Sequence, residues 1–331
     1  MTDLLLLFVP FFALVLMGWA AARGRVLPLE GIATMNSFVL FFGLSAMVFR
    51  LGASGALVQD GLLGLLLAYG VAGGVITLLA LTWSVRAGLA RRDGGLVALV
   101  TAFPNTGFLG LPLLTGLLGP QAAGPIAATL IIDVLLLSSL CLAWAHSHAA
   151  QDAPGDDPAE AWHAAQASLK GALRNPLLWS MGLGMGVAWL GWRLPHPVDE
   201  TARLLGLSAT PTALFTLGAI LARSQMQADA SQPVQAIWAP ALLKLCVHPL
   251  LVCAMGWGLQ RIGVPLTASG LLTVTMAAAL PSASNVSMLA EREGANTALV
   301  ARVILWTTAA AILTVALWAH VLGVQATSAT T

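Results

Sequence analysis

The chain has 331 residues, of which 58% are hydrophobic and only 9% are charged. Soluble domains carry about a quarter charged residues, so this composition excludes an ordinary water-soluble protein. The formal net charge is +1 at pH 7, and the balance of acidic and basic residues excludes a basic surface for nucleic acid. We therefore expect an integral membrane protein whose surroundings are the lipid bilayer.

Apolar stretches long enough to span a membrane, about 20 residues each, recur along the chain. The first lacks the preceding positive charge of a signal peptide, and Arg23 and Arg25 follow it instead, so we expect it to be retained as a helix. Ten spans are predicted: 3–22, 31–50, 61–83, 94–118 and 124–146 in the first half, and 176–192, 204–222, 238–260, 267–290 and 297–322 in the second.

Basic residues in the loops predict the orientation of these spans, because cytoplasmic loops are enriched in lysine and arginine. Nine of them fall on one side: Arg23, Arg25, Arg86, Arg91, Arg92, Lys170, Arg174, Arg223 and Arg292. Four fall on the other: Arg50, Arg193, Arg203 and Arg261. We expect a multi-pass protein of the inner (cytoplasmic) membrane with both termini outside.

A polar segment divides the chain into two sets of five spans. Residues 147–175 contain the acidic, proline-rich "DAPGDDPAE" and then "AWHAAQASLKGALRN", which has the pattern of a short amphipathic surface helix. We expect 1–146 to form one five-helix repeat, 147–175 a cytoplasmic linker, and 176–331 a second repeat. Because five is odd, the second repeat enters the membrane in the inverted orientation.

The fourth span of each half is interrupted. "TAFPNTGFLGLPLL" (101–114) contains Pro104, and "AAALPSASNVSML" (277–289) contains Pro281. Proline removes a helical donor, and hydrocarbon offers no replacement partner. Pro104 lies 104 − 3 = 101 residues into its half and Pro281 lies 281 − 176 = 105 into the other. Interrupted helices at matching positions of inverted halves are typical of a transporter's binding site.

The two breaks predict the chemistry of that site. The outgoing half-helices begin with free N–H groups that carry partial positive charge, so an anion can bind there without a basic side chain. Side-chain amides and hydroxyls add donors and acceptors. The alternative is a pair of proline kinks whose polar residues only satisfy the backbone, and the symmetric placement favours a site. The predicted substrate-binding residues are Pro104, Asn105, Thr106, Gly107, Pro281, Ser282, Ser284 and Asn285.

Three segments resemble the auxin efflux carrier family: "AFPNTGFLGLPLL" (102–114), "SATPTALFTLGAIL" (208–221), and "ALPSASNVSMLAEREG" (279–294) with "ARVILWTT" after it. That family includes plant auxin exporters and bacterial carriers implicated in malonate transport. The resemblance covers nearly the whole chain and implies an all-α fold of ten transmembrane helices in two inverted repeats, with discontinuous crossing helices 4 and 9. It also implies a scaffold of helices 1, 2, 6 and 7 and a moving transport domain of helices 3–5 and 8–10.

Helix 2 departs from the family pattern. Family members usually carry a proline motif there, as Pro211 does in helix 7, whereas this chain has "FFGLSAMVF" (41–49) without proline. No substrate contact is therefore assigned to helix 2.

Three charged residues fall inside predicted spans: Asp133, Lys244 and Arg302. Each is costly at that depth and is expected to face the protein interior with a partner. His248 shares a helix face with Lys244, four residues away. The resembling antiporters handle coupling ions with an acid and a lysine on the equivalent spans, which makes Asp133 and Lys244 a candidate proton-titrating pair. A structural salt bridge is the alternative, with Arg302 as another partner for Asp133.

These features predict a secondary transporter of small organic anions, mono- or dicarboxylates, working by elevator-type alternating access. A cation/proton exchanger of the same fold, using Asp133 and Lys244, is the rival. An intramembrane enzyme is favoured less, because the spans carry no nucleophile–base or metal motif. A receptor scaffold is favoured less, because it would not require two symmetric breaks. We expect no cofactor and no metal; proton or sodium coupling and a homodimer through the scaffold helices stay open.

Overall fold

The computed structural model describes residues 2–55, 61–146, 176–227 and 235–324. Across these ranges the secondary structure is helical, and no β-strand occurs in them. The predicted linker at 147–175 and its surface helix lie outside the described residues. The prediction of an all-helical protein is therefore confirmed for the described residues.

The first half contains α1 (Thr2–Arg23), α2 (Gly31–Phe38), η1 (Val39–Leu44), α3 (Ser45–Ala53), α4 (Leu62–Arg86), α5 (Arg91–Ala102), η2 (Thr106–Gly110), α6 (Leu111–Leu118), η3 (Pro120–Ala122), α7 (Ala123–Ile131), η4 (Ile132–Leu137) and α8 (Ser138–His146). The second half contains α10 (Pro176–Trp189), α11 (His196–Gln227), α12 (Gln235–Leu242), η5 (Leu243–Val247), α13 (His248–Arg261), α14 (Ala268–Ala278), α15 (Asn285–Arg292) and α16 (Thr297–Val321). η3 is a 3₁₀ turn, and η1, η4 and η5 are π-helical turns within longer helices. η2 is a π-helical turn that begins the helix continued by α6.

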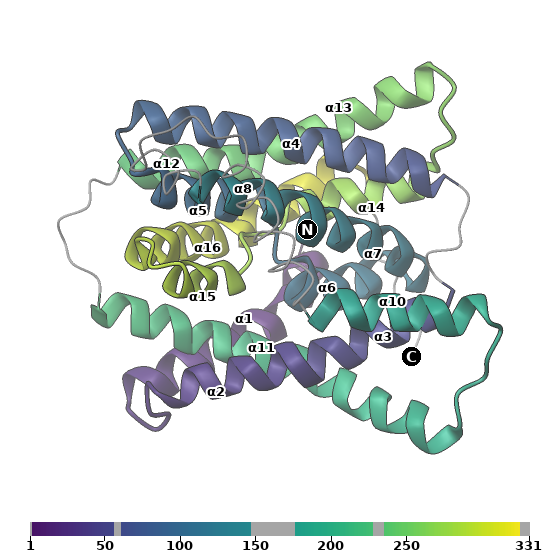
Figure 1. Cartoon of the computed structure of the whole chain (residues 1–331), viewed down its shortest axis with the longest axis horizontal. Coiled ribbons are helices and arrows are strands. Elements are labelled where there is room, and N and C mark those ends of the chain that lie inside the picture. Colours follow the sequence, from purple (N-terminus) through teal and green to yellow (C-terminus); the bar gives the residue numbers. More distant parts are fainter. Residues whose placement is uncertain (1, 56–60, 147–175, 228–234, 325–331) are drawn as a thin grey trace, which may run out of the picture.

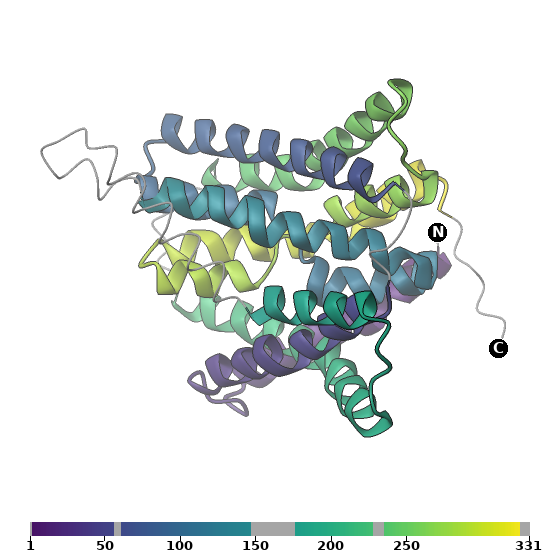
Figure 2. The same ribbon diagram turned by 45° about the vertical axis from the view of Figure 1, so that its right-hand side comes forward.

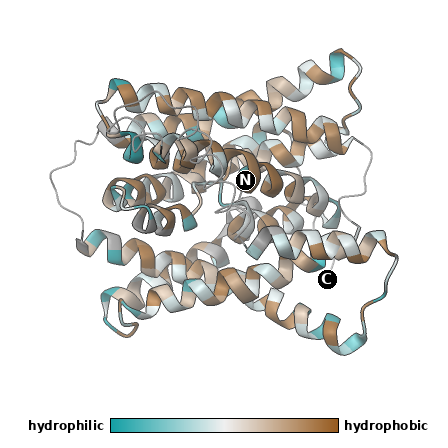
Figure 3. Ribbon diagram, in the orientation of Figure 1, coloured by the Kyte–Doolittle hydropathy of each residue, from teal (hydrophilic) through white to brown (hydrophobic). Residues whose placement is uncertain are grey.

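Six helical stretches among the described residues are long and apolar enough to cross a membrane: 31–53, 62–86, 120–146, 196–223, 237–261 and 297–321. Shorter apolar helices occur at 12–23, 106–118 and 268–278. Strongly hydrophilic residues gather toward the helix ends, and hydrophobic residues cover the middle (Figure 3). The protein is thus a multi-pass membrane protein, whereas the count of ten spans and the inverted repeat stay predictions.

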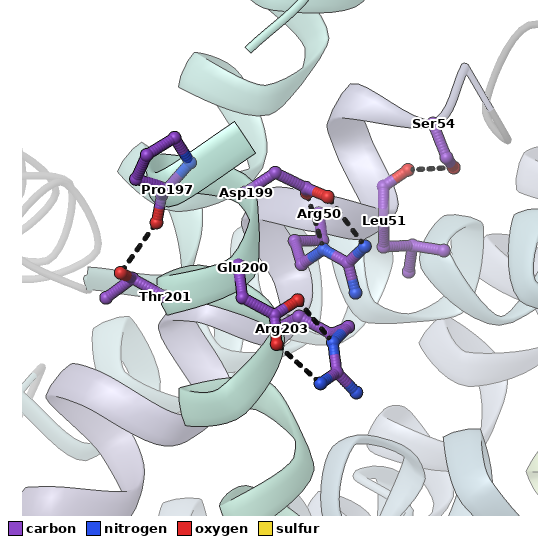
Figure 4. A network of polar contacts seen from close by, with 8 residues as sticks. All are labelled: Arg50, Leu51, Ser54, Pro197, Asp199, Glu200, Thr201 and Arg203. Carbon is purple, nitrogen blue, oxygen red and sulfur yellow. Dashed lines mark hydrogen bonds and ion pairs between the residues drawn. The ribbon is translucent and has the colours of Figure 1, made fainter. Parts of the chain in front are cut away.

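The seventh predicted span begins earlier than its apolar pattern indicates. The sequence predicts a start near 204, but α11 begins at His196 and is 32 residues long, about 48 Å at 1.5 Å per residue. Its first turns are charged: Asp199 accepts from Arg50 Nε at 2.9 Å, and Glu200 pairs with Arg203 at 2.6 Å (Figure 4). Hydropathy misses these turns because ion pairs, rather than apolar burial, accompany them.

The helices pack in two groups. α1, α2, α3, α10 and α11 lie along one side of the molecule, and α4, α5, α8 and α12–α16 form the other side (Figures 1 and 2). Glycines bring the first group together, as is common for helices in membranes. A Cβ on Gly18 of α1 would overlap the carbonyl oxygen of Phe215 on α11, and a Cβ on Gly184 of α10 would overlap that of Phe49 on α3.

Contacts between helix ends agree with the predicted alternation of sides. Three contacts join ends that the sequence places on the inner side: Trp19–Gln225, Asp93–Asn296 and His146–Glu293. The Arg50–Asp199 pair joins two ends that the sequence places outside. The structure therefore places these loops in two sets at opposite ends of the helices, while which end faces the cytoplasm stays a prediction.

The broken segments lie at the centre of the protein. Every residue from 94 to 106 is buried, and so is every residue from 273 to 284. Irregular backbone at membrane depth is tolerated where protein surrounds it, because lipid supplies no hydrogen bonds. Both breaks meet that condition.

Candidate functional site

The two breaks lie side by side, as predicted. The backbone N–H of Asn105 donates to the carbonyl of Pro281 at 2.8 Å, and the N–H of Ala283 donates to the carbonyl of Phe103 at 3.0 Å. Pro104 and Ser282 face each other in an antiparallel bridge. Two segments 177 residues apart thus satisfy part of each other's backbone at the centre of the protein.

The sequence explains why the first helix ends here. Phe103 precedes a proline, whose ring disfavours the helical conformation of the residue before it, and Phe103 is extended with φ −89° and ψ 107°. The chain turns helical again at Thr106, where the N–H groups of Leu109 and Gly110 both donate to the carbonyl of Asn105. The helix therefore stops at Ala102 and restarts after a short extended segment.

Four polar side-chain atoms at the breaks are buried without a hydrogen-bond partner among the described residues. They are Nδ2 of Asn105, Oγ1 of Thr106, Oγ of Ser282 and Oδ1 of Asn285. A buried polar atom left unpaired costs about 1–3 kcal/mol, so native structures rarely keep several together. The set combines an amide donor, an amide acceptor and two hydroxyls, which suits a small polar ligand.

The remaining predicted residues support this arrangement. Ser284 is 2% exposed at the same break, and its carbonyl accepts from the hydroxyl of Ser287. Gly107 is half-buried, and a Cβ there would lie 3.4 Å from Leu44 of η1. η1 belongs to the group of helices on the other side of the molecule. Gly107 therefore lies where the two groups meet.

Helix ends set the electrostatics of the breaks. The positive ends of η2–α6 and α15 begin at Thr106 and Asn285, and the negative ends of α5 and α14 lie at Ala102 and Ala278. Neither broken segment, 103–106 or 279–284, contains a basic side chain. Negative charge on a ligand would be balanced there by backbone N–H groups and the Asn105 amide.

A second buried polar cluster lies beside the end of α14. The hydroxyl of Tyr69 donates to Oδ1 of Asp133 at 2.8 Å, and Nζ of Lys244 donates to the carbonyl of Ala278 at 2.7 Å. Nζ of Lys244 also lies 3.3 Å from Nδ1 of His248. Asp133, Lys244 and His248 are all fully buried.

Among the described residues, no direct ion pair joins Asp133 to Lys244 or to Arg302. The Asp133 carboxylate is hydrogen-bonded to Tyr69 rather than to Lys244 or Arg302, and its Oδ2 has no hydrogen-bond partner among the described residues. Asp133 and Lys244 remain within electrostatic reach of each other. Arg302 is half-buried on α16. A direct ion pair to Asp133, the structural alternative, is therefore not what holds this carboxylate.

Asp133 and Lys244 both lie on π-helical turns, η4 and η5. π-turns shift the following side chains around the helix axis and are frequent at functional sites. The hydroxyl of Ser138 donates to the carbonyl of Asp133, five residues earlier, at 2.9 Å. The spacing of apolar residues alone does not reveal such turns.

Two residues of these clusters were missed by sequence reasoning. Tyr69 is the single tyrosine of the chain, and that rarity inside an apolar span was a usable signal. Thr307 accepts the N–H of Ser282 at 3.2 Å, and it lies in the "ARVILWTT" segment without a pattern that distinguishes it from its neighbours. Across the described ranges no group of three or more His, Cys, Asp or Glu side chains is placed to hold a metal ion.

Comparison with known proteins also indicates a membrane transporter. The family model described as "Membrane transport protein" matches residues 4–319. A protein of Rhizobium meliloti (strain 1021) named "Putative malonate transporter" is 24% identical over 321 residues, covering 95% of this chain and 94% of that protein. An "Uncharacterized transporter" of Methanothermobacter thermautotrophicus (strain Delta H) is 24% identical over 319 residues, covering 93% and 95%. Because the match extends over nearly the whole chain, the protein is a transporter rather than an enzyme, and it belongs to the auxin efflux carrier family of membrane transport proteins.

Proposed function

We propose that the protein is a secondary transporter of small carboxylates that binds its substrate between the two helix breaks. One observation carries the proposal. Two breaks from opposite halves of the chain meet at the buried centre, and four of their polar side-chain atoms have no partner among the described residues. A substrate with carboxylate oxygens can accept from the Asn105 amide, the hydroxyls and the N–H groups at the helix starts.

The pattern of helix packing supports two inverted repeats. If the protein contains two repeats, predicted helix 6 corresponds to helix 1, and helix 7 corresponds to helix 2. The packing of helix 1 against helix 7 should then have an equivalent in the packing of helix 6 against helix 2. These pairs are α1 with α11 and α10 with α3, and both are packed extensively. Each uses glycines on both partners: Gly18 and Gly218 in the first pair, Gly52 and Gly184 in the second. The reciprocal hydrogen bonds between the breaks follow the same relation.

The charge at the breaks favours an anion. Two positive helix ends lie at the breaks, and the negative end of α14 is already occupied by the ammonium of Lys244. The two positive ends then outweigh the remaining negative end, that of α5 at Ala102, so the potential at the breaks favours a carboxylate. The name of the Rhizobium relative points to malonate, which is a dicarboxylate. The N–H groups at each of the two helix starts can bind one of its carboxylate groups.

The two groups of helices support movement of one against the other. α1, α2, α3, α10 and α11 are joined by close glycine contacts, as expected of a rigid scaffold. The other group contains both breaks and the buried polar clusters. Where the groups meet, Gly107 faces apolar Leu44, a contact that can slide without breaking hydrogen bonds. An elevator-type movement of the second group, with substrate bound at the breaks, is the mechanism we propose.

A cation/proton exchanger is the second candidate, favoured by one observation. Asp133 is fully buried, and one of its carboxylate oxygens has no partner among the described residues, so that oxygen can take up a proton or face a cation. The carboxylate transporter explains more of the structure, because it uses the atoms at both breaks.

The test is a thermal-shift screen of the purified full chain against mono- and dicarboxylates, with sodium concentration and pH varied. Compounds that raise the melting temperature of the protein are then tested in proteoliposome counterflow assays, which measure exchange of the compound across the membrane. We expect malonate or a related carboxylate to raise the melting temperature and to exchange. Stabilisation by sodium or by pH alone, with no response to any carboxylate, would overturn the proposal in favour of the cation exchanger.

A further inference from the structure

We propose that Thr307 and Lys244 are positioning residues that together hold the second break open. In a continuous helix, two backbone groups at this point would bond each other. Here the side chains of Thr307 and Lys244 each bond one of them. Thr307 comes from α16 and Lys244 from η5, so two separate elements act on one point of the chain.

One backbone hydrogen bond of a continuous helix is missing at the second break. In an α-helix the N–H of Ser282 would donate to the carbonyl of Ala278, four residues earlier. Here the N–H of Ser282 donates to Oγ1 of Thr307 at 3.2 Å, and the carbonyl of Ala278 accepts from Nζ of Lys244 at 2.7 Å. Both partners of the missing bond are therefore satisfied by side chains.

Burial makes these replacements necessary. Ser282, Thr307 and Lys244 are all 0% exposed, so water cannot replace a lost partner without entering the core. Thr307 is oriented for its role, because its hydroxyl donates to the carbonyl of Val303 at 2.9 Å and leaves an oxygen lone pair for the N–H of Ser282. Pro281 removes its own N–H and disfavours the helical conformation of Leu280, which interrupts the helix. It supplies no new partner for the N–H of Ser282 or for the carbonyl of Ala278.

The two breaks are held differently. Asn105 follows Pro104 as Ser282 follows Pro281, yet the N–H of Asn105 donates to the carbonyl of Pro281 rather than to a side chain. The two breaks share reciprocal backbone bonds, because the N–H of Ala283 also donates to the carbonyl of Phe103. The second break has, in addition, the side chains of Thr307 and Lys244. Removing either side chain should loosen both breaks.

Lys244 is held at the negative end of α14, where the partial negative charge of the helix end balances its positive charge. The role of Thr307 and Lys244 in holding the break does not depend on the proposed function, whereas the effect of the break on transport rests on it. If the break closes or loosens, the unpaired atoms of Ser282 and Asn285 leave the position in which a substrate would meet them.

The experiment is a double-mutant cycle in the full chain with Thr307→Val, Lys244→Met and the combination. Thermal melting and hydrogen exchange of peptides covering 278–285 are measured. We expect each single variant to lower the melting temperature and to speed exchange, because one buried backbone group loses its partner. In the double variant the freed N–H and carbonyl can bond each other, so its exchange should be slower than in Thr307→Val and its loss of stability less than the sum.

Matched controls separate this role from general damage. Thr307→Ser keeps the hydroxyl and should restore exchange, whereas Thr308→Val removes a neighbouring buried hydroxyl that has no partner among the described residues. Because Lys244 also lies within reach of Asp133, the cycle is repeated with Asp133→Asn present. Additive losses in both backgrounds, or equal exchange in Thr307→Val and Thr308→Val, would overturn the inference.

Malonate is the probe for the link to function. We expect its dissociation constant to rise about tenfold in Thr307→Val and to return in Thr307→Ser. If malonate binds none of the proteins, the proposed substrate fails while the exchange and melting data still decide whether these residues hold the break. Unchanged malonate affinity together with non-additive stability would limit their role to the backbone.

Discussion

At the scale of single residues, the buried polar atoms of this protein fall into two kinds. Some complete a backbone hydrogen bond that the fold has lost, as Thr307 and Lys244 do. Others, such as Nδ2 of Asn105 and Oδ1 of Asn285, lack a partner among the described residues. Atoms of the second kind are those through which a ligand can gain affinity, because its own polar groups can satisfy them.

The two asparagines at the breaks provide the first prediction. Asn105→Ala and Asn285→Ala should each weaken carboxylate binding by about 1–3 kcal/mol without unfolding the protein, since each removes an amide that can donate to a carboxylate or accept from its protonated form. Malonate titration beside a melting curve measures both effects. Asn36→Ala serves as the control, because Asn36 is 4% exposed on α2 and lies outside the breaks. Wild-type binding in both site variants would mean that the amides only repair the backbone.

Asp133 provides the second prediction. Asp133→Asn keeps the shape of the side chain and an acceptor for the Tyr69 hydroxyl, but it removes a charge that faces Lys244. We expect a lower melting temperature with the pH dependence of transport unchanged, because Lys244 is left as a buried cation. Transport by the wild type and the variant, measured in proteoliposomes across a pH series, tests whether Asp133 carries the proton. A flat pH profile in the variant, where the wild type responds to pH, would instead assign proton coupling to Asp133.

At the scale of helices, small residues determine which elements pack closely. Two of the three glycines of α10, Gly182 and Gly184, face different surroundings. A Cβ on Gly184 would overlap the backbone carbonyl of Phe49 on α3, whereas a Cβ on Gly182 would meet nothing within 4 Å. The same residue type therefore brings helices together at one position and only adds backbone freedom at the other.

These two glycines provide the third prediction. Gly184→Ala should destabilise the protein by about 1–3 kcal/mol, the usual cost of forcing a group into a packed interior, because α10 must move away from α3. Gly182→Ala on the same helix should leave stability unchanged or raise it by about 1 kcal/mol, since alanine favours a helix. Melting curves of the two variants compare them directly. Equal destabilisation would show that α10 and α3 are not in close contact.

The sequence predicted the two breaks because proline interrupts a helix and apolar length reports a span. It predicted that the breaks meet because they occupy matching positions of the two halves. It did not predict Tyr69 or Thr307 beside Asp133 and Ser282, since tertiary packing alone brings these residues together. It also placed the start of α11 about eight residues too late. Hydropathy treats Asp199 as a loop residue, whereas its pairing with Arg50 lets the helix continue.

At the scale of the whole molecule, contacts sort the helix ends into two sets. Trp19 bonds to Gln225 at one end of the helices, and Arg50 bonds to Asp199 at the other. The polar ends and apolar middle define a slab across the helices (Figure 3). Loop charges then predict which set faces the cytoplasm.

The fourth prediction tests that orientation. In a variant lacking the three native cysteines, single cysteines are introduced at Trp192 and Ala87, both exposed and on opposite predicted sides. A membrane-impermeant maleimide added to intact cells should label Trp192→Cys and leave Ala87→Cys unlabelled until the membrane is opened. The reverse pattern would place both termini in the cytoplasm.

The unequal support of the two breaks has an energetic consequence for the transport cycle. If inverted halves exchange their conformations between the outward-facing and inward-facing states, identical halves would give those states equal free energy. Only the second half has Lys244 and Thr307 at its break, while the first relies on the carbonyl of Pro281. We therefore expect unequal populations of the two states at rest, so that substrate binding must shift an equilibrium that is already biased.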